Sequence, residues 1–84
     1  MAEGCAGLAR ALEQGRGTAA DPERAAKLYT EACGEDHAES CRSLALMYVQ
    51  GRGVKADPAQ GRSFLQRACD HGSDAACREA RNIE

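Results

Sequence analysis

The chain has 84 residues, which is enough for one small domain. Its side chains are 43% hydrophobic but only 4% aromatic, so a core must be built mainly from Ala, Leu and Cys, which favours closely packed helices over a ligand-sized apolar cavity. The formal net charge of -2, with acidic and basic residues interspersed, excludes the basic surface expected of a nucleic-acid-binding protein.

Neither a membrane span nor a secretory signal is visible in the sequence. No apolar run approaches the roughly 20 residues that a transmembrane helix needs. The first ten residues, MAEGCAGLAR, lack the positively charged start and the apolar stretch of a signal peptide. We therefore expect a soluble chain that does not insert into a membrane.

A 36-residue repeat organises the chain. Cys5, Cys41 and Cys77 are 36 residues apart, and Cys33 and Cys69 keep the same spacing. Aligning residues 4–39 with residues 40–75 without a gap gives 12 identical positions out of 36. The single domain, residues 1–84, is thus divided into units 4–39 and 40–75 and a partial third unit, 76–84.

Each unit reads as two helices joined by a turn. In the first unit, Asp21-Pro22 predicts the start of the second helix, because Asp is a strong N-cap and Pro is tolerated at the first helical position. Asp57-Pro58 does the same in the second unit. The second helices carry apolar or small residues at helical spacing: Ala25, Leu28, Tyr29 and Ala32, then Gly61, Phe64, Leu65 and Ala68.

The first helix of the second unit has its own apolar stripe, formed by Cys41, Leu44, Ala45 and Tyr48. It is expected to end at Gly51, which can adopt the left-handed conformation of a helix C-terminus. The tail CREARNIE begins a third first helix that is shorter and more polar. A two-helix unit cannot bury its stripe alone, so the sequence predicts an all-α, right-handed α/α solenoid of two repeats with a short capping helix.

The stretch EACGEDHAESC places His37 between Cys33 and Cys41 and raises three readings: a metal site, a redox pair or a disulfide. In the second unit the histidine is His71, which aligns with Glu35, so the spacing that a repeated metal site needs is lost. Zinc sites also favour closely spaced cysteines and four ligands, and a redox-active Cys-x-x-Cys is absent. We expect no metal and no cofactor, and each histidine alone is expected to be a solvated turn residue. Disulfides and free thiols remain open.

The cysteine spacing requires a turn if the two sulfurs are to meet. On one continuous helix Cys33 and Cys41 would be about 12 Å apart along the axis, at 1.5 Å per residue. A disulfide needs Cα atoms within roughly 7 Å. The polar segment GEDH, and DHGS in the next unit, can supply the turn between an antiparallel pair of helices.

The spaced pattern C-x2-LA-x2-Y-x2-GRGV-x2-DP, read from Cys41 to Pro58, resembles a Sel1-like repeat, and the Cys-x7-Cys spacing resembles its helical cysteine-rich branch. The chain departs from the family at Ala45, where Gly is usual, and at Gly61, where Ala is common. The resemblance implies a solenoid related to tetratricopeptide arrays that binds other proteins. It also implies that disulfides tie each second helix to the next first helix, pairing Cys33 with Cys41 and Cys69 with Cys77.

Two expectations about the whole protein follow from that pairing. The repeat partner of Cys5 would lie before the first residue, so Cys5 is expected to be an unpaired thiol in this chain; either it is a free thiol of the whole protein, or, as we favour, the chain is a fragment of a longer array or a processed form. Disulfides imply a periplasmic or secreted protein, with the cytoplasm as the alternative because no signal peptide is visible.

No catalytic constellation is found, so the protein is not expected to be an enzyme. Some relatives of the resembled branch have been labelled β-lactamases or penicillin binders, which gives the alternative function of a β-lactam-binding or weakly hydrolytic protein. Serine enzymes of that type need Ser-x-x-Lys, and none of the four serines, Ser40, Ser43, Ser63 and Ser73, is followed by Lys at that position.

The expected function is instead a scaffold that binds an unidentified protein or peptide, acting as a monomer. If Leu44, Ala45 and Tyr48 face the core, the opposite side of the first helices forms the concave face of the array. The predicted partner-binding residues on that face are Arg10, Gln14, Ser43, Leu46, Gln50, Glu79 and Asn82.

Overall fold

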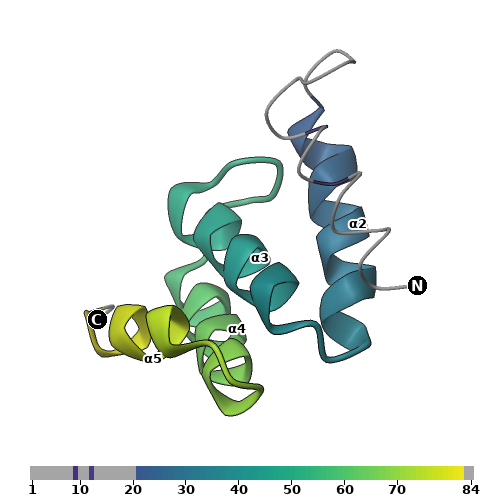
Figure 1. Ribbon diagram of the computed structural model, residues 1–84. Helices are drawn as coiled ribbons and strands as arrows, with labels where there is room; N and C mark the ends of the chain where they lie inside the picture. Colours follow the sequence, from purple (N-terminus) through teal and green to yellow (C-terminus); the bar gives the residue numbers. More distant parts are fainter. Residues whose placement is uncertain (1–8, 10–11, 13–20, 83–84) are drawn as a thin grey trace.

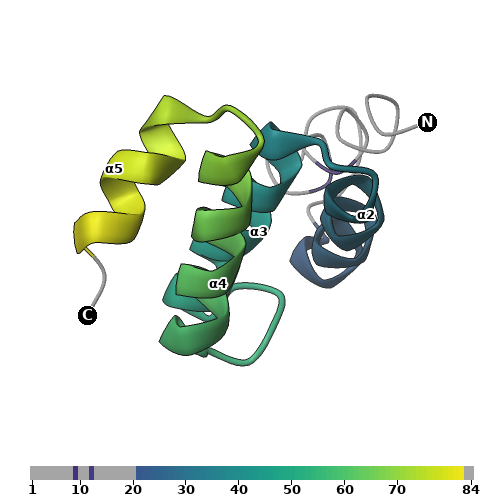
Figure 2. The ribbon, with the colours of Figure 1, turned by 90° about the horizontal axis from the view of Figure 1, so that it is seen from below.

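The computed structural model describes residues 9, 12 and 21–82 (Figure 1). Within these residues the chain forms helices and no strands: α2 (Pro22–Gly34), α3 (Ala38–Gln50), α4 (Pro58–Asp70) and α5 (Asp74–Asn82). Each helix packs against the next one along the chain, so α3 lies between α2 and α4, and α5 lies on the side of α4 away from α2 (Figure 2). This is the α/α solenoid that the repeat predicts.

The helix ends confirm the capping residues expected from the sequence. An Asp21 carboxylate oxygen accepts the backbone N–H of Arg24 at 3.1 Å, and Asp57 accepts that of Gln60 at 3.2 Å. A proline follows each of these caps at the first helical position. At the end of α3, Gly51 has a left-handed φ of 70°, and its N–H is bonded to the carbonyl of Met47.

The described core is made of small aliphatic residues and cysteine, as the composition requires. Tyr29 is its one fully buried aromatic side chain among the described residues, and Tyr48 stacks on Phe64 at its edge with ring centroids 5.5 Å apart. The buried cluster joins all four helices and includes Ala9 and Leu12. Its other members are Ala25, Ala26, Tyr29, Cys33, Cys41, Leu44, Ala45, Met47, Leu65, Ala68 and Ala76.

Gly61 lets α4 approach α3 closely. This residue is buried in the first half of α4, and a Cβ atom placed on it would lie 2.6 Å from Cγ2 of Val49 and 3.0 Å from the carbonyl oxygen of Ala45. The Gly that departs from the family pattern therefore has a packing reason. The absent side chain of Gly61 leaves room for the backbone of α3 at Ala45.

Both disulfides implied by the family resemblance are present in the structure. Cys33, in the last turn of α2, is bonded to Cys41 at the start of α3, with the Cα atoms 4.7 Å apart. Cys69, near the end of α4, is bonded to Cys77 of α5, with a Cα separation of 4.6 Å. Each bond closes the same eight-residue separation across a tight turn.

The two turns use different residues at the same repeat position. Asp36 has a φ of 64° and Gly72, 36 residues later, has a φ of 106°. Glycine adopts this left-handed region freely, whereas Asp is one of the few other residues that tolerates it. The Asp36 carboxylate lies 3.1 Å from Nε2 of His71 and 3.7 Å from the Arg67 guanidinium, so it links this turn to the end of α4.

Replacing Gly61 by Ala should destabilise the fold. The added methyl group meets a β-branched side chain and a backbone oxygen, and overpacking of this kind costs about 1–3 kcal/mol. The better helix propensity of Ala returns at most about 1 kcal/mol. We expect the free energy of unfolding, measured by urea titration, to fall by about 1 kcal/mol, and Val49→Ala to restore part of it in the double variant.

Gly34→Ala provides the matched control for this substitution. Gly34 ends α2 without a positive φ, and a Cβ there would have no neighbour within 4 Å. The same chemical change should therefore leave stability equal or raise it by about 0.5–1 kcal/mol. Equal losses at both positions would refute the close-packing explanation for Gly61.

Removing either disulfide should cost a large share of the stability. Closing a nine-residue loop contributes roughly 2.5 kcal/mol in the chain-entropy model, and the two loops have equal length. The Cys33→Ala/Cys41→Ala variant should lose more than the Cys69→Ala/Cys77→Ala variant, because Cys33 and Cys41 are only 1% and 0% exposed and their loss also leaves a cavity. Urea unfolding followed by circular dichroism measures both losses, and a smaller loss for the first pair would contradict this ranking.

Candidate interaction face

One side of α3 carries side chains that do not belong to the core. Glu39, Ser43, Leu46 and Gln50 follow one another at intervals of three or four residues, and Arg42 lies three residues after Glu39 and four before Leu46, so all five share one side of the helix. Gln50 is exposed, and Ser43 and Leu46 are partly exposed.

Leu46 differs from the partly buried apolar side chains that pack against the described core. The partly buried hydrophobic side chains that pack against the described core are Leu28, Tyr48, Val54, Phe64, Cys69 and Ala80, and Leu46 is not among them. Its neighbours on the helix in both directions, Ala45 and Met47, are buried. Leu46 is thus a partly exposed apolar side chain on a polar side of α3.

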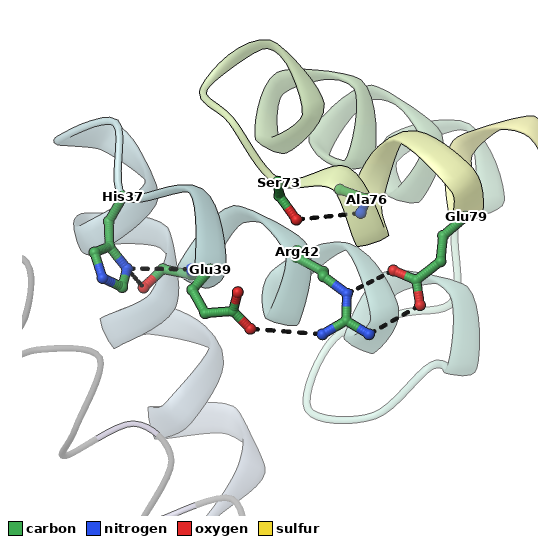
Figure 3. Close-up of polar contacts among 7 residues, drawn as sticks. His37, Glu39, Arg42, Ser73, Ala76 and Glu79 are labelled. Atoms are coloured by element: carbon green, nitrogen blue, oxygen red, sulfur yellow. Dashed lines mark hydrogen bonds and ion pairs between the residues drawn. The ribbon is translucent and has the colours of Figure 1, made fainter.

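An ion pair joins this side of α3 to α5 (Figure 3). The Arg42 guanidinium donates two hydrogen bonds to the Glu79 carboxylate, from Nε to Oε1 at 2.6 Å and from Nη2 to Oε2 at 3.0 Å. Glu39, one turn before Arg42, adds a third contact at 3.5 Å. The two-point geometry fixes the orientation of the guanidinium and holds the first helices of successive units together.

The same contacts favour the charged form of the Arg42 guanidinium. Its pKa is raised above the ordinary value, chiefly by the side-chain hydrogen bond to Glu79; partial burial opposes the rise, and the negative charges of Glu79 and Glu39 add to it.

The predicted partner-binding residues have different surroundings. Ser43, Leu46 and Gln50 lie together on α3, and Glu79 and Asn82 lie on α5. The Glu79 carboxylate is already bonded to Arg42, an arrangement that the sequence analysis missed because the two residues are 37 positions apart. Arg10, Gln14 and the unpaired thiol predicted at Cys5 lie outside the described residues.

His37 differs from the solvated turn residue that the sequence suggested. It is the N-cap of α3: its Nδ1 accepts the backbone N–H of Ser40 at 3.2 Å and lies 2.6 Å from the Ser40 hydroxyl (Figure 3). At the equivalent position of the next unit, Ser73 caps α5 by accepting the N–H of Ala76 at 3.1 Å. The repeat aligns His37 with Ser73 and not with His71, because His37 and Ser73 serve the same capping role.

The Ser40–His37 contact has the residue types of a nucleophile and its base, but its surroundings are those of a cap. Ser40 is only 1% exposed, which leaves its hydroxyl inaccessible to a substrate. The same nitrogen that would act as the base also accepts a backbone N–H. Among the described residues, no group of three or more His, Cys, Asp or Glu side chains is arranged to hold a metal ion.

None of α2 to α5 combines the length and the apolar character that crossing a bilayer requires.

The family model of the Sel1 repeat matches the chain twice, over residues 2–37 and 38–73. The two matches have the 36-residue period found in the sequence. A comparison with curated proteins gives no significant match.

Solved structures of similar proteins agree with the family match. Cysteine-rich protein B (HcpB) of Helicobacter pylori is 32% identical over 90% of this chain, with a TM-score of 0.87. The protective antigen c5321 of uropathogenic Escherichia coli, which has a Sel1-like repeat fold, is 25% identical over 89% of the chain, also with a TM-score of 0.87. A Sel1 repeat protein of Oxalobacter formigenes shares the fold over the whole chain, with a TM-score of 0.96 at 23% identity.

The chain spans 57% of the Helicobacter protein, 24% of the Oxalobacter protein and 16% of the Escherichia protein, so it corresponds to part of each. The family model covers most of the chain, and HcpB, which is 32% identical to it, is also a cysteine-rich protein. The chain therefore belongs to the Sel1 repeat family.

Proposed function

We propose that this protein is a disulfide-stapled scaffold that binds a protein or peptide through the first-helix face formed by Ser43, Leu46 and Gln50. Sel1 repeat proteins in general mediate protein interactions and are non-catalytic, and this chain has two disulfides that stabilise its helix pairs. The observation that carries the proposal is Leu46, which is partly exposed on a polar side of α3 and does not pack against the described part of the core.

The chemistry of this face suggests the kind of partner. An apolar side chain at the centre of an interface contributes most when polar neighbours exclude water around it. Ser43 and Gln50 offer hydrogen-bond donors and acceptors on either side of Leu46 along the helix. A peptide segment with one apolar anchor between polar groups fits this arrangement. Asn82 of α5 extends the polar rim, whereas Glu79 contributes less because Arg42 already occupies its carboxylate.

The Arg42–Glu79 pair supports the face indirectly. It fixes α5 against α3 at the point where the two first helices meet, so a partner would contact a surface whose elements are already oriented. Preorganisation reduces the ordering cost of binding, which matters for a small binding face built from few repeats.

We place the protein in the periplasm or outside the cell, working as a monomer. Two disulfides and the similarity to HcpB support an extracytoplasmic location, because disulfides persist in oxidising compartments. The β-lactam-binding alternative has no supporting residues: the one serine–histidine contact found among the described residues is a buried helix cap.

Leu46→Arg should weaken partner binding without unfolding the protein. The substitution places a charge where an apolar anchor is needed, and loss of a central anchor costs about 2 kcal/mol or more, which weakens binding by roughly 30-fold. The partner is first obtained by affinity capture from the periplasmic or secreted fraction of the source cells, and its affinity for each variant is then measured by calorimetry with purified components.

Gln60→Arg is the matched control. It adds the same charge at an exposed position of α4, where the backbone N–H of Gln60 is bonded to the Asp57 cap and does not depend on the side chain. Both variants should unfold within about 0.5 kcal/mol of the unmodified protein, as surface substitutions usually do. Undiminished binding by the Leu46→Arg protein, with Gln60→Arg as the reference, would show that the partner uses another surface.

A further inference from the structure

The two disulfides have the same geometry in the fold but different surroundings. Each joins the last turn of a second helix to the start of the next first helix. Cys33 and Cys41 are 1% and 0% exposed, whereas Cys69 and Cys77 are partly exposed and line an open pocket of about 380 Å³ between α4 and α5. The repeat thus contains two copies of the same disulfide-linked turn, one with a buried disulfide and one with a disulfide open to solvent.

The residues that make this difference can be named from the 36-residue period. The pocket at the second disulfide is lined by Arg62 and Gln66 of α4 and by Ala80 and Arg81 of α5. The equivalent positions around the first disulfide are Ala26, Thr30, Leu44 and Ala45, three of which are at most 3% exposed. Two buried alanines are therefore replaced by two exposed arginines, one on each wall of the pocket.

Both arginines are available to an incoming ligand. Neither Arg62 nor Arg81 is ion-paired with another described residue, unlike Arg42 and Arg67. Arg81 also opposes coverage of the pocket by a helix. A helix docked on α5 as α4 is docked on α3 would cover position 81, which is equivalent to the buried Ala45, and burying a guanidinium there is unfavourable.

We propose that the Cys69–Cys77 disulfide is a thiol–disulfide exchange site for small anionic thiols, while the Cys33–Cys41 disulfide is a protected structural bond. Exchange requires access of a thiolate to one sulfur and stabilisation of the thiolate that leaves. The pocket gives access, and the two guanidinium groups attract an anionic reductant and stabilise a cysteine thiolate.

The reaction proceeds by two exchanges. The thiolate of the reductant attacks Sγ of Cys69 and forms a mixed disulfide, while the Cys69–Cys77 bond breaks and its electron pair stays on Sγ of Cys77. Cys77 is the better leaving group because it lies in the first half of α5, where the helix dipole stabilises negative charge, whereas Cys69 is near the end of α4. A second reductant thiolate attacks the reductant sulfur of the mixed disulfide. It releases the oxidised reductant and Cys69 thiolate, and both cysteines take up protons.

The tryptic peptides of the chain allow the two disulfides to be followed separately. Cleavage after Lys27 and Arg42 isolates peptide 28–42 with Cys33 and Cys41, and cleavage after Arg67 and Arg78 isolates peptide 68–78 with Cys69 and Cys77. The folded protein, with Cys5 first alkylated, is exposed to glutathione for increasing times and quenched with acid. New thiols are labelled with a second alkylating reagent, and both peptides are quantified by mass spectrometry.

Peptide 68–78 should become labelled at least about tenfold faster than peptide 28–42, since exchange rates depend on access to the sulfur. Equal rates, or faster labelling of peptide 28–42, would overturn the proposal. This comparison needs no variant, because the first disulfide of the same molecule is the control.

The role of the arginines is tested by the charge of the reductant. Glutathione is anionic and cysteamine is cationic, so the ratio of their rates at peptide 68–78 reports electrostatic attraction independently of folding. Arg62→Gln and Arg81→Gln should each lower this ratio by about two- to threefold at low salt, whereas Lys27→Gln, on the exposed side of α2, should leave it unchanged. A ratio unaffected by both arginine substitutions would refute the recognition of anionic thiols.

Discussion

The covalent link across each turn from a second helix to the next first helix is the constraint on which this small array depends. A core built from Ala, Leu and Cys buries little apolar surface per residue, so it stabilises helix packing less than a core with large aromatic side chains would. The bond between Cys33 and Cys41 holds the ends of α2 and α3 at a Cα separation of 4.7 Å, and its counterpart does the same for α4 and α5. The contact between α3 and α4 has no such covalent link, so it depends mainly on packing.

That packing contact explains the use of small residues at the centre of the array. Gly61 leaves room for the backbone of α3 at Ala45, and a methyl group at Gly61 would overlap Val49. The same principle extends to the contact between successive units: a Cβ at Gly53, which has a φ of 76°, would overlap the carbonyl of Pro22 at the start of α2. Small side chains therefore serve two contacts, one within a unit and one between units, and they let the helices approach without a large core.

The features that the sequence predicted are those that depend on local or repeated physics. Asp21, Asp57 and Gly51 act at helix ends through their own backbone neighbours, so their roles are visible in short motifs. The non-local features were missed. The Arg42–Glu79 pair depends on how two first helices meet, and the cap at His37 depends on a rotamer that only the folded turn selects. A signal for the cap was present, since His37 aligns with Ser73, a residue type that is common at N-caps.

The repeat also shows how equivalent positions can diverge while the backbone stays the same. Asp36 in the first turn adopts a left-handed conformation that is unfavourable for most residues other than glycine, and its carboxylate contacts His71 and Arg67. The equivalent Gly72 adopts that conformation freely and has no side chain to make such a link. Ala26 and Ala45 become Arg62 and Arg81, and a buried disulfide becomes one that lines a pocket. Backbone geometry in these units is held by the caps, the glycines and the cysteines. Because those few positions are sufficient, the remaining side chains are free to give one copy of the unit a packing role and the other an exposed, charged surface.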